Sequence, residues 1–288
     1  MKQVRLFSLL VAALFFQGMV TAQVVYTYSE TGVTLENGVV ATITKPSVEG
    51  KVPVVFLLHG FASQKDEVGD MYKRLAAKLA TEKGIASMRI DFRGWGESAG
   101  KMQESNIQGQ IDDTQVAYEY LVEQSFVDSS KIGIVGFSLG GGIAIVSAAQ
   151  HPGWFKSMAV WSSVGDFYQD FLEELGQNSF DKAAANGTVD IDLGWRSISL
   201  GDVFFKSLKT YDLMSEIARY SGAFLAIAGD QDFSVDYVDD YLARVAGHPK
   251  VKHIIKNADH IYGVLSEDQS MAEEVLSYTT DWFARTLR

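Results

Sequence analysis

The chain of 288 residues contains no cysteine. It can therefore form no disulfide, and its hydrophobic core has to hold the fold together unaided. Zinc sites are also disfavoured, because thiolate ligands are absent and no set of His, Asp and Glu residues has the spacing of metal ligands. We expect neither a metal site nor a cross-linked scaffold.

The sequence also lacks an excess of basic residues. It has 36 acidic against 25 basic side chains, a formal net charge of -11. Nucleic acids and anionic membranes are negatively charged, so such a chain is a poor partner for either. We expect no nucleic-acid partner, while the acidity serves solubility and does not indicate a substrate.

One apolar run opens the chain, and it is too short to anchor it in a membrane. Lys2 and Arg5 precede the run Leu6–Phe16, and small residues follow up to Ala22. Basic, apolar and small-residue segments in this order, with no stop-transfer pattern behind them, are typical of a secretory signal peptide. We therefore predict that residues 1–22 are removed and that the mature protein is exported, periplasmic or secreted, with no membrane anchor. A retained anchor helix is the alternative.

Residues 23–288 show no internal repeat and no low-complexity linker, and two kinds of segment alternate along them. Apolar, often β-branched runs predict strands buried in a parallel sheet. They occupy Val39–Thr44, Val52–Leu58, Ile85–Phe92, Lys131–Phe137, Met158–Trp161, Ala223–Ala228 and Val251–Ile255. Helices are predicted at Met71–Thr81, Ile107–Gln124, Leu139–Gln150 and Ser266–Leu287. The alternation predicts one α/β domain, a mostly parallel twisted sheet with helices on both faces.

A stretch from about 162 to 215 breaks this alternation. It is rich in aromatic residues and contains the alternating segment Thr188–Leu193, with which Arg196–Leu200 can pair as a small hairpin. We interpret the stretch as a cap inserted over the site.

A serine flanked by glycines follows the strand predicted to end at Phe137. The segment Gly136-Phe137-Ser138-Leu139-Gly140 lies where that strand turns into the next helix. Such a corner presents the hydroxyl above the sheet, glycines permit close backbone approach, and the helix N-terminus offers N–H groups to an oxyanion. The pattern predicts Ser138 as a nucleophile.

The serine and three further motifs resemble those of the α/β-hydrolase superfamily, from about Val52 to the C-terminus. Besides the glycine-rich loop at 91–98, the motifs are His59-Gly60-Phe61, Gly229–Val235 and Asn257–His260. The resemblance implies an oxyanion hole made by the N–H groups of Phe61 and Leu139. It also implies a catalytic triad in the chain order serine, acid, histidine.

The base of this triad is expected to be His260, since only this histidine follows the last predicted strand. We expect His59 to order the oxyanion loop. For the acid, Asp230 and Asp232 both follow the strand at 223–228, and their spacing alone leaves both open. In the superfamily the second acid of such a loop usually holds the histidine, so the resemblance favours Asp232, with Asp230 bracing the loop.

Within the superfamily the chain resembles small bacterial feruloyl (cinnamoyl) esterases. The matching segments are His59-Gly60-Phe61, Lys65-Asp66-Glu67, Gly84–Ser87, Asp91–Ser98 and the insertion after the sixth strand. The resemblance implies a serine hydrolase that cleaves small-molecule carboxylic esters through an acyl-enzyme on Ser138, with no cofactor.

An aromatic acyl group is the finer expectation from this resemblance. Trp195, Phe204 and Phe205 of the cap would either contact such a group or form the core of the cap itself. An acyl-peptide or dienelactone-type hydrolase and a catalytically inactive binding protein of the same fold are the alternatives, because one fold hosts many functions. Nothing in the sequence indicates an oligomeric state.

Overall fold

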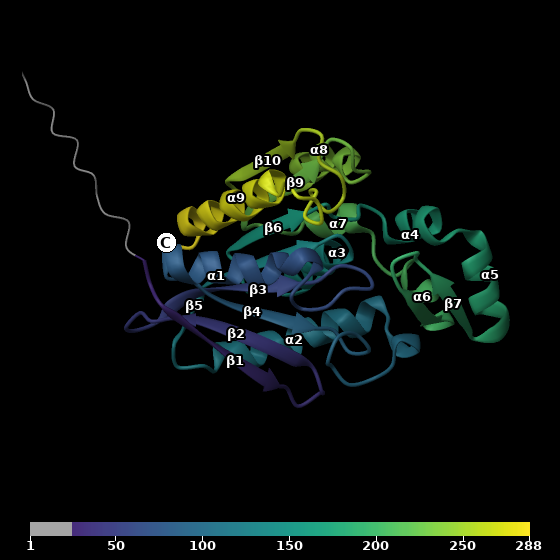
Figure 1. Ribbon diagram of the computed structural model, residues 1–288, viewed down its shortest axis with the longest axis horizontal. Coiled ribbons are helices and arrows are strands. Elements are labelled where there is room, and N and C mark those ends of the chain that lie inside the picture. Colours follow the sequence, from purple (N-terminus) through teal and green to yellow (C-terminus); the bar gives the residue numbers. More distant parts are fainter. Residues whose placement is uncertain (1–24) are drawn as a thin grey trace, which may run out of the picture.

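The computed structural model describes residues 25–288, so the predicted signal peptide lies outside the described residues. In that part of the chain, none of the helices is long and apolar enough to cross a membrane. A central sheet with helices on both sides forms the main body, and a smaller group of elements projects from one end of it (Figure 1).

The central sheet contains eight strands in the order β1-β2-β4-β3-β5-β6-β9-β10. Their bounds are β1 Tyr28–Thr34, β2 Val40–Pro46, β3 Val52–Leu58, β4 Ala86–Asp91, β5 Val127–Phe137, β6 Ser157–Trp161, β9 Ala223–Gly229 and β10 Lys250–Ile255. Strand β2 runs antiparallel to both β1 and β4, and the remaining neighbours are parallel. The predicted mostly parallel sheet is confirmed. Strand β1 was not expected, because its residues are almost all exposed and give no apolar run.

Helices cover both faces of the sheet. Helices α1 (Met71–Lys83) and α9 (Ser270–Thr286) pack side by side over one face (Figure 1). The other face is covered by α2 (Ile107–Val122), α3 (Leu139–Gln150), α7 (Leu213–Ile217) and α8 (Val235–Arg244). Two short 3-10 helices, Val68–Asp70 and Met102–Glu104, lie in loops.

The helix predictions differ from the structure in two respects. Helix α9 begins at Ser270 and not at Ser266, whose hydroxyl donates to the carbonyls of Gly263 and Asp268 and whose N–H closes a turn on Gly263. Serine side chains that bond the local backbone favour turns over helix interiors. Helices α7 and α8 were not predicted, and neither were the helices of the insertion described next.

The insertion forms the projecting cap, which lies to the right in Figure 1. It contains α4 (Phe167–Leu175), α5 (Gln177–Asn186), β7 (Thr188–Asp192), β8 (Ser197–Gly201) and α6 (Asp202–Ser207). Strands β7 and β8 pair antiparallel, so the predicted hairpin is confirmed. Of the three aromatic residues considered for the cap, Phe204 and Phe205 are buried and Trp195 is exposed. The two phenylalanines are therefore core residues, in the same buried cluster as side chains of the sheet.

Parallel strands bring their carboxyl ends to one edge of the sheet, and the loops of interest all leave from that edge. The register pairs Leu58 at the end of β3 with Gly136 near the end of β5. The same edge carries the ends of β9 and β10, since Gly229 pairs with Ile255. Loops that are far apart in the sequence therefore meet there, as is usual for α/β sheets.

The packing of α9 gives a first prediction. Phe283 is fully buried, and its ring fills the space beside Gly133 of β5, where an added Cβ would lie only 2.5 Å from the ring. Phe283→Ala should lower the free energy of unfolding by about 3–5 kcal/mol, through lost burial and the cavity that remains. Urea denaturation measures this change.

Ser277→Ala is the matched control on the exposed side of the same helix. It should change the free energy of unfolding by less than about 0.5 kcal/mol. Equal effects of the two substitutions would show that α9 does not pack against β5.

Candidate active site

Ser138 occupies a strained corner between β5 and α3. Its φ of 52° and ψ of -118° lie outside the regions that L-residues ordinarily adopt. Such strain persists only where the surrounding structure holds it, and it is concentrated at functional sites. The Ser138 N–H donates to the carbonyl of Trp161 at 2.9 Å, and its carbonyl accepts from Gly141 and Val164. The corner is therefore held from both sides.

Glycines on either side of the serine are required by contact with backbone. A Cβ on Gly136 would lie 2.1 Å from the carbonyl oxygen of Gly140, and one on Gly140 would lie 2.1 Å from that of Leu58. Any side chain at either position would push α3 away from β5 or from the end of β3. The glycine pattern thus sets how closely α3 approaches the loop after β3.

The structure brings His260 and Asp232 together. Nδ1 of His260 lies 2.9 Å from Oδ1 of Asp232, and the Asp232 carboxylate also accepts a bond from the hydroxyl of Ser234. Burial alone would raise the pKa of Asp232, but its bonds with His260, Ser234 and Ser162 outweigh burial and lower the pKa below its ordinary value. Asp232 is therefore an ionised acceptor for the Nδ1 proton of His260.

Asp230 and Asp259 have other partners. The Asp230 carboxylate accepts from the N–H of Asn257 at 2.7 Å and from the side chain of Gln231. Asp259 accepts from the N–H of Gly263 within a turn. Asp230 thus joins the loop after β9 to the loop after β10, and His260 follows in that second loop.

Two phenylalanine rings flank the imidazole of His260. The ring of Phe137, directly before Ser138, lies 5.1 Å from that of His260 between centroids. The ring of Phe233 stacks on His260 at 5.4 Å and 22°, and 45% of Phe233 is exposed. No sequence pattern singled out Phe233, although it directly follows Asp232 in the acid loop. It gives the site an accessible aromatic surface.

The loop after β3 and the start of α3 carry backbone N–H groups that have no acceptor in the described part of the chain. The Gly60 N–H donates to Glu67 Oε2 at 2.7 Å, and the Ser63 hydroxyl donates to Glu67 Oε1 at 2.5 Å. Within residues 25–288, the N–H groups of Phe61 and Leu139 donate to no acceptor. Both N–H groups are therefore free to donate to an anion at this edge of the sheet.

His59 holds the peptide plane that carries the Phe61 N–H. Its Nδ1 lies 2.8 Å from the carbonyl oxygen of Gly60, and its Nε2 accepts the N–H of Phe92 at 3.2 Å. These contacts require an Nδ1–H tautomer and leave no ring nitrogen for proton transfer. Burial lowers the pKa of His59 to about 4. His59 is thus a neutral brace of the loop.

Buried ion pairs lie behind this loop and explain two motifs that the sequence only matched by resemblance. Lys65 Nζ lies 3.1 Å from the buried carboxylate of Asp91 and also pairs with Glu97. Asp91 accepts the N–H groups of Lys65 and Glu97, at 2.6 and 2.9 Å. Asp66 pairs with the buried Arg89. Pairing and hydrogen bonding compensate the cost of burying these charges.

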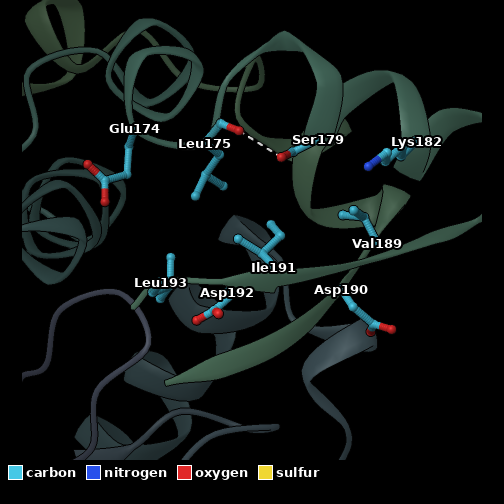
Figure 2. A pocket seen from close by; sticks show the side chains of 9 residues that line it. All are labelled: Glu174, Leu175, Ser179, Lys182, Val189, Asp190, Ile191, Asp192 and Leu193. Carbon is cyan, nitrogen blue, oxygen red and sulfur yellow. Dashed lines mark hydrogen bonds between the residues drawn. The ribbon is translucent and has the colours of Figure 1, made fainter. Parts of the chain in front are cut away.

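Two cavities in the described part of the chain are lined by neither Ser138 nor His260. One, of about 410 Å³, is in the cap between α4, α5 and β7, and polar side chains such as Glu174 and Lys182 line it beside Ile191 (Figure 2). The other, of about 360 Å³, lies beside α2. In the described part of the chain, no group of three or more His, Asp or Glu residues could hold a metal ion. The candidate catalytic groups therefore line neither of these two cavities.

Comparison with known proteins finds related sequences over part of the chain. A family model described as serine aminopeptidase, S33, matches residues 51–186. An uncharacterized protein of Escherichia coli is 32% identical over 116 residues, which are 40% of this chain and 39% of that protein. Monoacylglycerol lipase abhd6-B of Xenopus laevis is 31% identical over 130 residues, 44% of this chain and 36% of the lipase. The matched segment thus spans about two fifths of these relatives' length.

Solved structures match nearly the whole chain. Est1E from Butyrivibrio proteoclasticus, solved with ferulic acid bound, superposes with a TM-score of 0.72 at 20% sequence identity. The match covers 88% of this chain and 99% of that one. At this identity the likeness concerns the fold.

The two acids can be separated by substitution. Asp232→Asn should lower turnover about ten-thousandfold if the carboxylate holds the tautomer of His260, because an amide can donate to Nδ1 and so favour the wrong tautomer. Asp230→Asn is the matched control in the same loop, and it should mainly lower the free energy of unfolding. Steady-state kinetics on both folded variants measures the difference. The opposite ranking of turnover would assign the acid to Asp230.

His59 gives a prediction on pH and stability. Its folded pKa of about 4 lies below the ordinary value of 6.5, so the unfolded chain binds more protons between these pH values. Stability from this group is therefore complete above about pH 6.5 and is lost as pH falls towards 4, by about 1.4 kcal/mol per pH unit. In His59→Gln this part of the slope should be missing. Denaturation at pH 4.5, 5.5 and 6.5 compares the slopes, and equal slopes would contradict a neutral buried His59.

Proposed function

We propose that this chain, which has the α/β-hydrolase fold, is a serine hydrolase that cleaves carboxylic esters, with Ser138, His260 and Asp232 as its catalytic triad. The observation that carries the proposal is the contact of His260 with the buried carboxylate of Asp232, on a histidine whose ring also packs on Phe137, the residue directly before the strained Ser138. Among the described residues, Nε2 of His260 has no hydrogen-bond partner, so it is free to accept a proton from a nucleophile at this edge of the sheet.

The reaction follows from these parts. Ser138 Oγ attacks the acyl carbon and transfers its proton to His260 Nε2, while Asp232 accepts the bond from Nδ1–H and stabilises the imidazolium. The N–H groups of Phe61 and Leu139 donate to the oxyanion. His260 then protonates the departing alcohol, and a water activated by His260 cleaves the acyl-enzyme. No cofactor takes part in these steps.

An aromatic acyl group is the finer part of the proposal. The exposed ring of Phe233 beside His260 supports it, since an aromatic pair adds about 1 kcal/mol beyond the area buried. The likeness in fold to Est1E, whose structure holds ferulic acid, also supports it. Phe204 and Phe205 do not, because both are buried in the cap.

Amide cleavage is the second candidate function, and the match of residues 51–186 to a family described as serine aminopeptidase favours it. Both reactions would use the same acyl-enzyme on Ser138. A panel of p-nitrophenyl esters of increasing acyl length, methyl ferulate and aminoacyl p-nitroanilides separates the candidates. Faster turnover of the anilides than of every ester would overturn the ester proposal.

The nucleophile is tested directly by Ser138→Ala. Turnover should fall by about a millionfold, as in other serine hydrolases that lose the nucleophile. A fluorophosphonate probe should label the wild type and leave Ser138→Ala unlabelled. Ser147→Ala is the matched control on α3, because its buried hydroxyl has no hydrogen-bond partner in the described structure, and it should be labelled normally. Labelling that persists without Ser138 would show that another residue is the nucleophile.

A further inference from the structure

We propose that Arg196 of the cap is a positioning residue that holds the oxyanion loop, so that the cap takes part in stabilising the transition state of every substrate. The proposal rests on the proposed function above. It assigns to the cap a task beyond the choice of acyl group.

The contact joins segments that are 134 positions apart in the sequence. Nη1 of Arg196, between strands β7 and β8 of the cap, donates to the carbonyl oxygen of Ala62 at 2.6 Å. The guanidinium also lies 6.0 Å from the ring centroid of Trp95, which is buried. No carboxylate within residues 25–288 lies within salt-bridge distance of Arg196. Its guanidinium therefore bonds a backbone carbonyl and forms no ion pair within these residues. A charged donor strengthens such a bond.

Ala62 needs to be held. Its φ of 56° is in the left-handed region, which a residue with a Cβ disfavours. The Gly60 N–H donates to Glu67 and the Gly60 carbonyl accepts from His59, and both of these residues belong to the main body. The cap contacts the same loop through the hydrogen bond from Arg196 to the carbonyl of Ala62. The free N–H of Phe61 lies between these anchors.

Aromatic packing joins the cap to the loop at the same place. The ring of Phe61 contacts Phe171 and Phe204 of the cap at 4.9 and 5.6 Å between centroids, and Trp95 of the body at 5.9 Å. Phe171 and Phe204 also pack on each other. The side chain and the backbone of the oxyanion loop therefore both depend on where the cap lies.

Further contacts hold the cap against the body near α2. The hydroxyl of Ser207 accepts the N–H of Ile107 at 3.1 Å. An added Cβ on Gly201 would lie 2.0 Å from the carbonyl oxygen of Gln103, so the end of β8 packs directly on the 3-10 helix Met102–Glu104. In this structure the cap is thus docked on the body beside α2, and Arg196 transmits its position to the loop.

The test compares Arg196→Ala with wild type on p-nitrophenyl acetate and on longer acyl esters. A displaced oxyanion donor should lower kcat by about tenfold to a hundredfold, less than its complete loss and similar for each ester, with KM within about twofold. Arg196→Lys, which keeps a charged donor, should be intermediate, and added guanidinium chloride should partly restore the alanine variant.

Lys209→Ala is the matched control. It removes a cap cation that lies 3.9 Å from the ring of Tyr168 and makes no contact with the oxyanion loop among the described residues. Its kcat should stay within about twofold of wild type. An equal loss in both variants would mean that any weakened cap lowers activity, which overturns the role of Arg196.

Hydrogen exchange gives a readout that does not depend on activity. Peptides covering residues 59–66 should exchange faster in Arg196→Ala than in Lys209→Ala and wild type. Unchanged exchange together with unchanged kcat would overturn the proposal, as would a loss confined to KM for large or anionic acyl groups, which would make Arg196 a substrate-binding residue. If wild type shows no turnover that depends on Ser138, the proposed function fails, and exchange alone decides whether Arg196 holds the loop.

Discussion

The close contact between the first turn of α3 and the end of β3 is the constraint on which the site depends. Gly140 lies so near the carbonyl of Leu58 that no side chain fits between them. This contact places the N-terminus of α3, with the N–H of Leu139, beside the loop that carries the N–H of Phe61. Among the described residues the Leu139 N–H has no partner because it lies in the first turn of α3, where intrahelical bonds have not begun, and the Phe61 N–H lies in the turn beyond the end of β3.

Buried charge gives the loops of the site their shape. Asp91 joins Lys65 to the backbone of the glycine-rich loop, and Glu67 receives the N–H of Gly60. Isolated charges would be costly to bury, and these are satisfied by several bonds each. Burial nevertheless raises the pKa of Glu67, against the bonds from Ser63, Gly60 and Val68. The loops are thus held by polar contacts that tolerate little rearrangement.

The cap and the main body share one hydrophobic core. Phe204 and Leu200 of the cap belong to the same buried cluster as Ile143 of α3 and Phe56 of the sheet. A separate lid would have a core of its own and a hydrated surface against the body. Because apolar contact here is continuous, displacement of the cap would expose part of the main core, and the docked position is favoured.

Local pattern determined the strands of the central sheet other than β1, the helices α1, α2, α3 and α9, the glycine-flanked corner of Ser138 and the hairpin at 188–200. It did so because apolar runs, turn residues and glycines act on their own neighbours in sequence. It left open the acid: Asp230 and Asp232 are two residues apart in one loop, and only the packing of β9 against β10 decides which carboxylate contacts His260. Phe233 and Arg196 carried no signal either, since their partners come from loops that meet only when parallel strands align their carboxyl ends. Such contacts depend on the positions of whole elements, and these are decided by the tertiary structure.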